Sequence, residues 1–70
     1  MTITNCEIKR STVDPSVMLV NVQYDNAPDW ELLFTYFPNE IRFDKEELIG
    51  MTDKDALDLR LERDLEYLRS

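Results

Sequence analysis

The sequence predicts an α+β domain in which a three-stranded antiparallel β-meander precedes a short helical turn and one long C-terminal helix. Two stretches rich in β-branched and aromatic residues, 17–24 and 30–37, are typical of β-strands. A third stretch, 52–70, repeats leucine at helical spacing and contains neither Gly nor Pro. Because 70 residues make one domain, we expect a single unit, 1–70, in which the long helix packs on one face of the sheet.

Three strands account for the first half of the chain. They are expected over residues 2–12, 17–24 and 30–37, with turns at 13–16 and 25–29 that contain Pro, Asp and Asn. Short polar connections join antiparallel neighbours, so the strands form a meander. The face expected beneath the helix consists of Met18, Val20, Val22, Trp30, Leu32, Phe34 and Tyr36.

The segment after the third strand predicts a short helix with a defined start and end. Residues 40–43 either add a short fourth strand or plug the sheet with their apolar side chains. Asp44 and Glu47 match the D-x-x-E capping box, which predicts a helical turn over 45–49. Gly50 is the only glycine, and it stands where a helix needs a left-handed residue to end.

The long helix has a clear N-cap and a clear apolar side. The Thr52 hydroxyl can accept a hydrogen bond from the backbone N–H of Asp55. Four leucines then recur at spacings of four, four and three, which places them on one side of the helix that we expect to be buried. We call this set the leucine stripe: Leu57, Leu61, Leu65 and Leu68. Leu59 lies off the stripe.

Acidic residues define another side of the same helix. We call this set the acidic stripe: Asp55, Asp58, Glu62 and Glu66. It is either a solvated helix face or a surface for a basic partner. Six further acids occur in the second turn, at the start of the third strand and in the short helix, and they would enlarge that surface if the fold brings them together: Asp25, Asp29, Glu31, Asp44, Glu46 and Glu47.

The charge balance restricts the class of partner. Fifteen acids against eight bases give a net charge of −7 and a pI near 4.3. We therefore expect a protein partner, basic or a second copy, with no direct nucleic-acid binding and no membrane association. The acidic stripe is about 16 Å long, over which duplex DNA carries about ten negative charges. Its four carboxylates cannot imitate a duplex alone.

The composition offers little for catalysis. There is no histidine, one glycine and one cysteine, which excludes a histidine base, a glycine-rich phosphate loop and a disulfide framework. We expect no enzyme activity, no catalytic or metal-binding residues and no cofactor. Cys6 is expected to be a small core residue of a reducing compartment. The start of the chain has no signal-peptide pattern and no apolar run long enough to span a membrane, so we expect a cytoplasmic protein.

An apolar set is left over on the other face of the predicted sheet. It comprises Val17, Leu19, Leu33 and Phe37. One helix covers one face of such a sheet, so these side chains form a patch that requires an explanation. Either the loops and residues 38–49 fold over the patch, or it is an interface for a homodimer or another protein.

The final stretch, ELIGMTDKDALDLRLERDLEYLRS, resembles the ends of small acidic proteins encoded by bacteriophages and prophages. The short, acidic, single-domain chain is also similar in style to phage-encoded inhibitors of host systems, including anti-CRISPR proteins and inhibitors of host RNA polymerase. The resemblance implies a protein that works by binding in the host cytoplasm, blocking a basic nucleic-acid site on a host protein. It carries over no functional residue, since that group shares no motif. The alternative is a homo-oligomeric structural or accessory phage protein that uses the spare sheet face.

Overall fold

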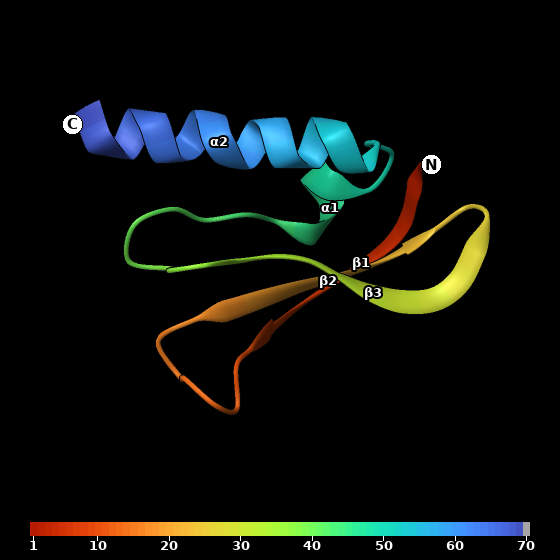
Figure 1. Ribbon diagram of the computed structural model, residues 1–70, viewed down its shortest axis with the longest axis horizontal. Helices are drawn as coiled ribbons and strands as arrows, with labels where there is room; N and C mark the ends of the chain where they lie inside the picture. The colour runs from red at the N-terminus through yellow and green to blue at the C-terminus, as the bar shows by residue number, and fades with distance from the viewer. Residues whose placement is uncertain (70) are drawn as a thin grey trace.

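The computed structural model describes residues 1–69 as a three-stranded antiparallel sheet followed by a short and a long helix (Figure 1). The strand order is β1-β2-β3, so the predicted meander and the α+β class are confirmed. The long helix lies along one side of the sheet, and residues 37–44 run between the two (Figure 1). The elements are β1 (Ile3–Arg10), β2 (Met18–Tyr24), β3 (Ala27–Tyr36), α1 (Lys45–Leu48) and α2 (Asp53–Arg69).

The two hairpin connections differ in length. Between β1 and β2, the Ser11 hydroxyl accepts hydrogen bonds from the backbone N–H groups of Val13 and Asp14, each at 3.2 Å. Between β2 and β3 the turn is only two residues long, and β3 starts at Ala27, opposite Tyr24. The predicted loop over 25–29 was therefore too long. Pro28 is tolerated in the strand because β3 lies at the edge of the sheet.

A β-bulge interrupts the pairing of β2 with β3. Val20 lies opposite Phe34, whereas Asn21, the next residue, lies opposite Leu32. Leu33 is thus an extra residue in β3, and a single extra residue moves all side chains on one side of it to the opposite face.

The bulge overturns part of the predicted covered face. Phe34 and Tyr36, after the bulge, are buried in the core with Val20 and Val22. Trp30 and Leu32, before the bulge, are 48% and 58% exposed. The prediction that all four β3 residues share the buried face was wrong, because strict alternation does not anticipate the extra residue.

The start of β1 shows a similar shift. The register changes between Ile3 and Asn5, and Ile3 enters the core while Thr4 is exposed. Cys6 is buried as expected. Burial raises the pKa of its thiol, and the nearby Lys45 ammonium opposes this rise only in part.

Residues 40–43 close the core as a plug. They form no strand in the described chain, and Ile41 and Phe43 are buried. The Phe43 ring packs against Phe34 and Tyr36, with centroid distances of 4.9 and 5.1 Å. Leu48 of α1 is fully buried in the same cluster. The inner face of the sheet is therefore largely covered before the chain reaches α2.

The linker between the helices pairs with β1. Gly50 has φ +97°, the left-handed conformation predicted for the end of the short helix. Its N–H donates to the Ile3 carbonyl at 2.8 Å, and the Ile3 N–H donates to the Met51 carbonyl at 2.8 Å. Thr52 then starts α2 as predicted, accepting at its hydroxyl from the backbone N–H of Asp55 at 3.1 Å. This linker covers one end of the β1 edge.

Candidate interaction surface on helix α2

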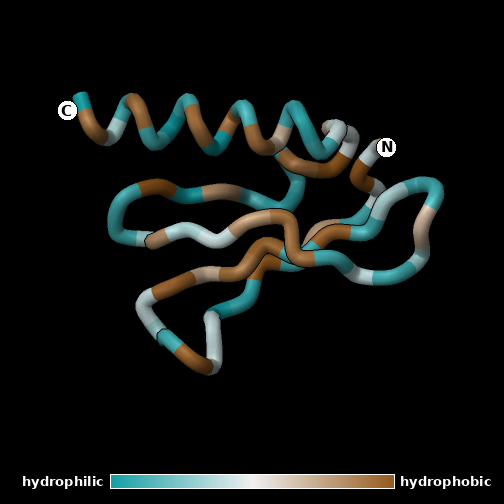
Figure 2. Tube along the Cα trace, in the orientation of Figure 1, coloured by the Kyte–Doolittle hydropathy of each residue, from teal (hydrophilic) through white to brown (hydrophobic). Residues whose placement is uncertain are grey.

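Helix α2 turns its leucine stripe outward. The exposed fractions of Leu57, Leu61, Leu65 and Leu68 are 45%, 58%, 43% and 75%. Hydrophobic positions recur along the whole helix in Figure 2, including its far end beyond the sheet. The prediction that this stripe is the buried side of the helix was wrong.

A different side of α2 meets the rest of the molecule. Ala56 is fully buried, and Leu59, the leucine off the stripe, packs against the core. Arg60 and Arg63 complete this side and are half-buried. Positions 56, 59, 60 and 63 share one side of an α-helix. Because residues 37–44 and α1 already fill the core, the helix docks through a small residue and long side chains.

Arg60 fastens the middle of α2 to the edge of the sheet. Its Nε donates to the Thr35 carbonyl at 3.1 Å, and its guanidinium lies 5.8 Å from the centroid of the Phe34 ring. It also pairs with Asp64 one turn on, at 3.0 Å. The aliphatic stem of an arginine covers apolar surface while its charged end reaches polar groups, so Arg60 serves as a core-facing residue.

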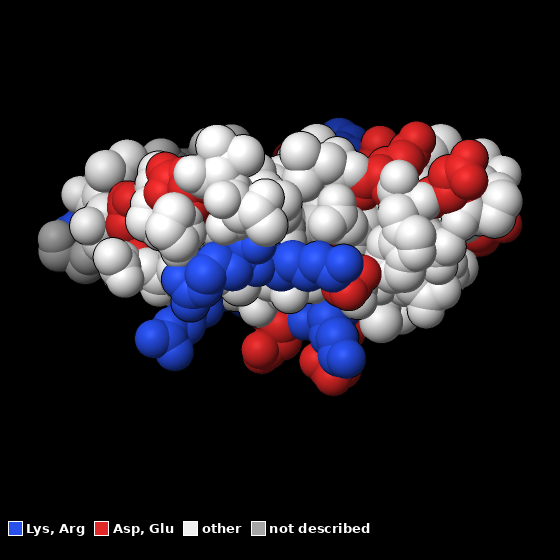
Figure 3. Space-filling view, turned by 90° about the horizontal axis from the view of Figure 1, so that it is seen from below, with Lys and Arg blue, Asp and Glu red and all other residues white. Residues whose placement is uncertain are grey.

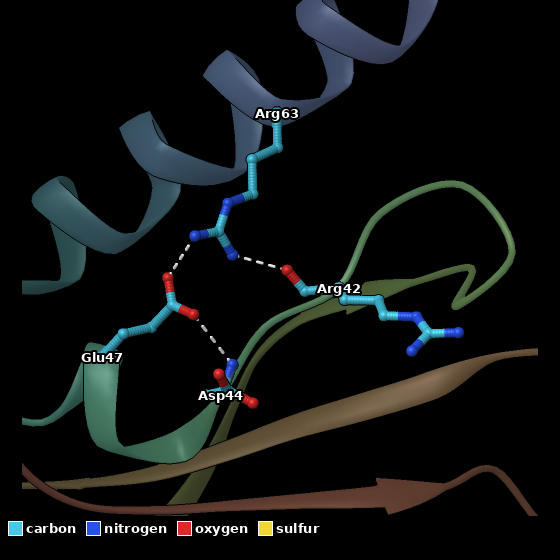
Figure 4. Close-up of polar contacts among 4 residues, drawn as sticks. All are labelled: Arg42, Asp44, Glu47 and Arg63. Carbon is cyan, nitrogen blue, oxygen red and sulfur yellow. Dashed lines mark hydrogen bonds and ion pairs between the residues drawn. The ribbon is translucent and has the colours of Figure 1, made fainter.

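Arg63 fastens α2 to α1 and to the plug. Figure 4 shows its guanidinium between the Glu47 carboxylate and the Arg42 carbonyl. The guanidinium donates to that carbonyl at 2.5 Å and also to the carboxylate. The same guanidinium lies 4.7 Å from the centroid of the Phe43 ring. Glu47 also accepts from the backbone N–H of Asp44 at 3.0 Å, as the predicted capping box requires.

The environment of Glu47 lowers its pKa. Burial raises the pKa of this carboxyl, but the hydrogen bond from Arg63, the backbone N–H of Asp44 and the positive charge of Arg63 outweigh burial. Glu47 is therefore held as a carboxylate in a half-buried ion pair between α1 and α2. It belongs to the structural contact between α1 and α2 and is not a free member of an acidic surface.

The acidic stripe is exposed along α2. Asp55, Asp58, Glu62 and Glu66 are all exposed. Helical geometry places the stripe about 110° around the axis from the centre of the leucine stripe. Asp58 borders the leucines and pairs with Lys54 at 3.4 Å. The exposed part of α2 thus presents leucines with carboxylates along one flank.

The remaining candidate acids lie elsewhere. Asp25, Asp29 and Glu31 belong to the β2–β3 hairpin and are exposed, with Asp25 accepting a hydrogen bond from the backbone N–H of Thr2 at 3.1 Å. Asp44 and Glu46 are exposed at α1. Viewed from below, Lys and Arg side chains cross the middle of the face, and acidic groups lie in separate places toward both ends and beside these basic side chains (Figure 3). That face does not bring the candidate acids together.

The four candidate apolar residues do not share one surface. Leu33, at the bulge, packs against the core, and Val17 and Leu19 are half-buried. Phe37 is exposed and lines a shallow hollow with Asp64 and Leu68 of α2. Phe37 therefore extends the leucine stripe at its C-terminal end.

Apolar periodicity alone does not say which side of a helix meets the core, so the sequence does not mark the leucine stripe as an exposed surface. A signal was nevertheless present. Ala56, Arg60 and Arg63 follow a helical spacing with Leu59, and a small residue beside long amphipathic ones is suited to close docking on an already covered sheet.

Two further properties of the described residues bear on the site. No three Cys, Asp or Glu side chains within residues 1–69 are placed to bind a metal ion together. In the same range, no helix combines the length and apolar character required to span a membrane.

Comparison with protein-family models, with curated proteins and with solved structures finds no significant match to this chain.

Proposed function

We propose that the protein is a non-catalytic protein-binding module and that α2 is its binding element. One observation carries the proposal: the leucine stripe is exposed on the side of α2 that faces away from the protein's own core. Exposed leucines in a continuous row on a small domain are typical of an interaction site. A helix that presents such a row commonly binds in an apolar groove of its partner.

The charge around the stripe indicates the chemistry of the partner. The acidic stripe flanks the leucines, and the whole chain carries −7. A partner with basic residues along its binding surface would be attracted at long range and oriented on contact. Together with the resemblance to phage-encoded inhibitors, this favours a basic nucleic-acid-handling protein of a bacterial host, whose nucleic-acid site the module would block.

The test is capture of a partner from a bacterial lysate by the tagged protein, followed by binding measurements with the purified partner. The first variant replaces three acids of the acidic stripe: Asp58→Asn, Glu62→Gln and Glu66→Gln. The matched control removes the same charge from the hairpin: Asp25→Asn, Asp29→Asn and Glu31→Gln. Both sets consist of exposed residues.

We expect the α2 variant to weaken binding at least tenfold and to reduce its dependence on salt, while the hairpin variant changes binding little. Leu61→Gln should also abolish binding, because it places a polar amide in the apolar contact. If both α2 changes left binding unaltered, α2 would not be the binding element.

A further inference from the structure

We propose that two copies of the chain associate through antiparallel pairing of residues 6–10 of β1, which joins their two sheets into one continuous sheet. This association goes beyond the proposed function and does not depend on it, because it uses the edge strand β1 and no residue of α2. The hydrogen bonding of the sheet edges and the order of charges along β1 both favour it.

The pairing of β1 with β2 shows which backbone groups of β1 point away from the sheet. The Ser11 N–H donates to the Val17 carbonyl at 2.9 Å, and the register with β2 continues without a shift over residues 5–10. Hydrogen-bonded pairs alternate along an antiparallel ladder, so the odd-numbered residues of this stretch bond to β2 and the even-numbered ones point outward. We call the outward groups the open edge: the backbone N–H and C=O of Cys6, Ile8 and Arg10.

The open edge differs from the other edges of the sheet. Nothing within residues 1–69 bonds to it, whereas Ile3, nearer the start of β1, bonds to residues 50 and 51. The other edge strand, β3, carries features that protect sheet edges: Pro28 has no N–H, Leu33 forms a bulge, and Arg60 binds a backbone carbonyl. Unpaired edge groups are a template for another strand, so the open edge is suited to β-augmentation.

The charges on β1 select a second copy and one register. Glu7 and Lys9 share the outer face of β1 and pair with each other at 3.2 Å. In an antiparallel pair centred on Ile8, Glu7 lies opposite Lys9 of the second copy, and the two-fold axis gives this contact twice. Directly opposite side chains have Cβ atoms about 5 Å apart, so the two glutamates and two lysines alternate in sign around the axis. Moving the axis by one residue would set Glu7 against Glu7 or Lys9 against Lys9, and the charges therefore specify this register.

The charges on the inner side of β1 do not oppose the pairing. Cys6 lies opposite Arg10 of the second copy, and Arg10 donates to the Pro15 carbonyl of its own loop at 2.6 Å. Helix α1 brings the Lys45 ammonium and the Glu46 carboxylate near Cys6. These two opposite charges largely cancel in their effect on Arg10, so the outer face decides the register.

The backbone provides most of the affinity of this pairing. Three hydrogen-bonded residue pairs give about six hydrogen bonds, whereas a standard interface of about 800 Å² on each partner contains about ten. Main-chain hydrogen bonds supply the affinity in β-augmentation, which buries little side-chain surface. The net charge of −7 on each copy opposes association at long range. We therefore expect a dimer that forms at high concentration and dissociates on dilution.

The first measurement is the molar mass of the purified protein by light scattering or sedimentation, from low micromolar to about millimolar concentration. It is made at 150 mM salt, where the screening length is about 8 Å and the long-range repulsion is reduced. The expected result is a rise from 8.3 kDa toward twice that mass.

Amide hydrogen exchange over the same range locates the contact. Exchange should slow several-fold with rising concentration at Cys6, Ile8 and Arg10, because their N–H groups become hydrogen-bonded in the dimer. Thr35 is the control, since its carbonyl binds Arg60 on the β3 edge and its N–H points to the same side. The exchange of Thr35 should not change with concentration.

A charge exchange tests the register. Glu7→Lys surrounds the axis with four lysines and should weaken the dimer at least about tenfold, although it makes each copy less negative. Adding Lys9→Glu to the same chain restores the alternation with the signs exchanged, and should recover the dimer. Glu31→Lys is the matched control, because it makes the same charge change at an exposed position of β3. It should dimerise at least as well as the wild type, with the circular dichroism of all variants unchanged.

Three results would each overturn the pairing. They are a protein that stays monomeric throughout the range, a dimer that protects none of the open-edge amides, and a dimer that Glu7→Lys weakens no more than Glu31→Lys does. A monomer that protects these amides only on binding another protein would assign the open edge to a strand of that protein and would also overturn self-pairing. None of these results bears on α2, whose binding is measured separately with the acidic-stripe variant.

Discussion

At the scale of single residues, Glu47 and Arg63 contribute most clearly to the position of α2. Arg63 contacts a carboxylate, a carbonyl and an aromatic ring on segments that precede α2 in the chain. The side chain of Arg63 is 29% exposed and that of Glu47 is 28% exposed, so water screens their interaction only in part. The pair therefore contributes more than the exposed pair of Lys54 with Asp58.

The lowered pKa of Glu47 makes this contribution depend on pH. Its ordinary value is 4.5 and its value in the folded chain is lower, so its stabilisation is complete above pH 4.5 and is lost as pH falls through the folded value. Glu47→Gln should lower the free energy of unfolding by about 1–2 kcal/mol at pH 7, and the difference from wild type should vanish at low pH.

Urea unfolding followed by circular dichroism between pH 2.5 and 7 measures this dependence. Glu46→Gln is the control, since it alters an exposed neighbour on the same helix. Equal effects of the two variants at every pH would mean that the ion pair with Arg63 adds nothing to stability.

At the scale of elements, local signals in the sequence predicted which helices, strands and turns form. Long-range packing decided which side of each strand and helix faces the core. The start of α2 at Thr52 follows from the hydrogen bond that its side chain accepts, and the left-handed conformation of Gly50 follows from the backbone freedom of glycine. Both effects act within one turn of the chain. The bulge at Leu33 and the rotation of α2 depend on how β2 and residues 37–44 fill the core. Neither was predictable from periodicity alone. The bulge leaves Trp30 and Leu32 exposed, and the rotation of α2 leaves its leucine stripe exposed, although both sets were expected to be buried.

The orientation of α2 leads to a direct comparison of two leucines. Leu59→Ala should lower the free energy of unfolding by about 2 kcal/mol, because Leu59 packs against the core. Leu61→Ala should change it by no more than about 0.5 kcal/mol, as expected for an exposed position. Chemical denaturation at low micromolar concentration compares the two. A larger loss for Leu61→Ala would show that the helix docks through its leucine stripe after all.

At the scale of the whole molecule, the candidate acids predicted from the sequence divide into separate groups. The acidic stripe of α2 is continuous because helical spacing alone aligns it. The hairpin and α1 acids are set apart by the topology, and one of them, Glu47, is used in an internal ion pair. The sequence could supply the total charge but not its distribution, which depends on where the meander and the plug leave each segment.

The net charge of −7 predicts a response to salt. The molecule measures 37 × 26 × 15 Å, and the screening length falls from about 30 Å at 10 mM salt to about 8 Å at 150 mM. Self-repulsion across the whole chain is thus felt at low salt and largely screened at the higher concentration. The melting temperature should therefore rise between these two salt concentrations in a calorimetric or circular-dichroism scan. A fall would show that the ion pairs of the folded chain outweigh the repulsion.

The pairing of residues 50–52 with the start of β1 has a consequence for the order of folding. Each hairpin of the meander joins neighbours in sequence, and such contacts form within microseconds. Ile3 and Met51 are separated by about 48 residues, so their contact must close a loop that spans most of the chain, at a larger entropic cost. We expect the meander to assemble first and the two helices to join it late, so that α2, the proposed binding element, is the last part of the chain to be positioned.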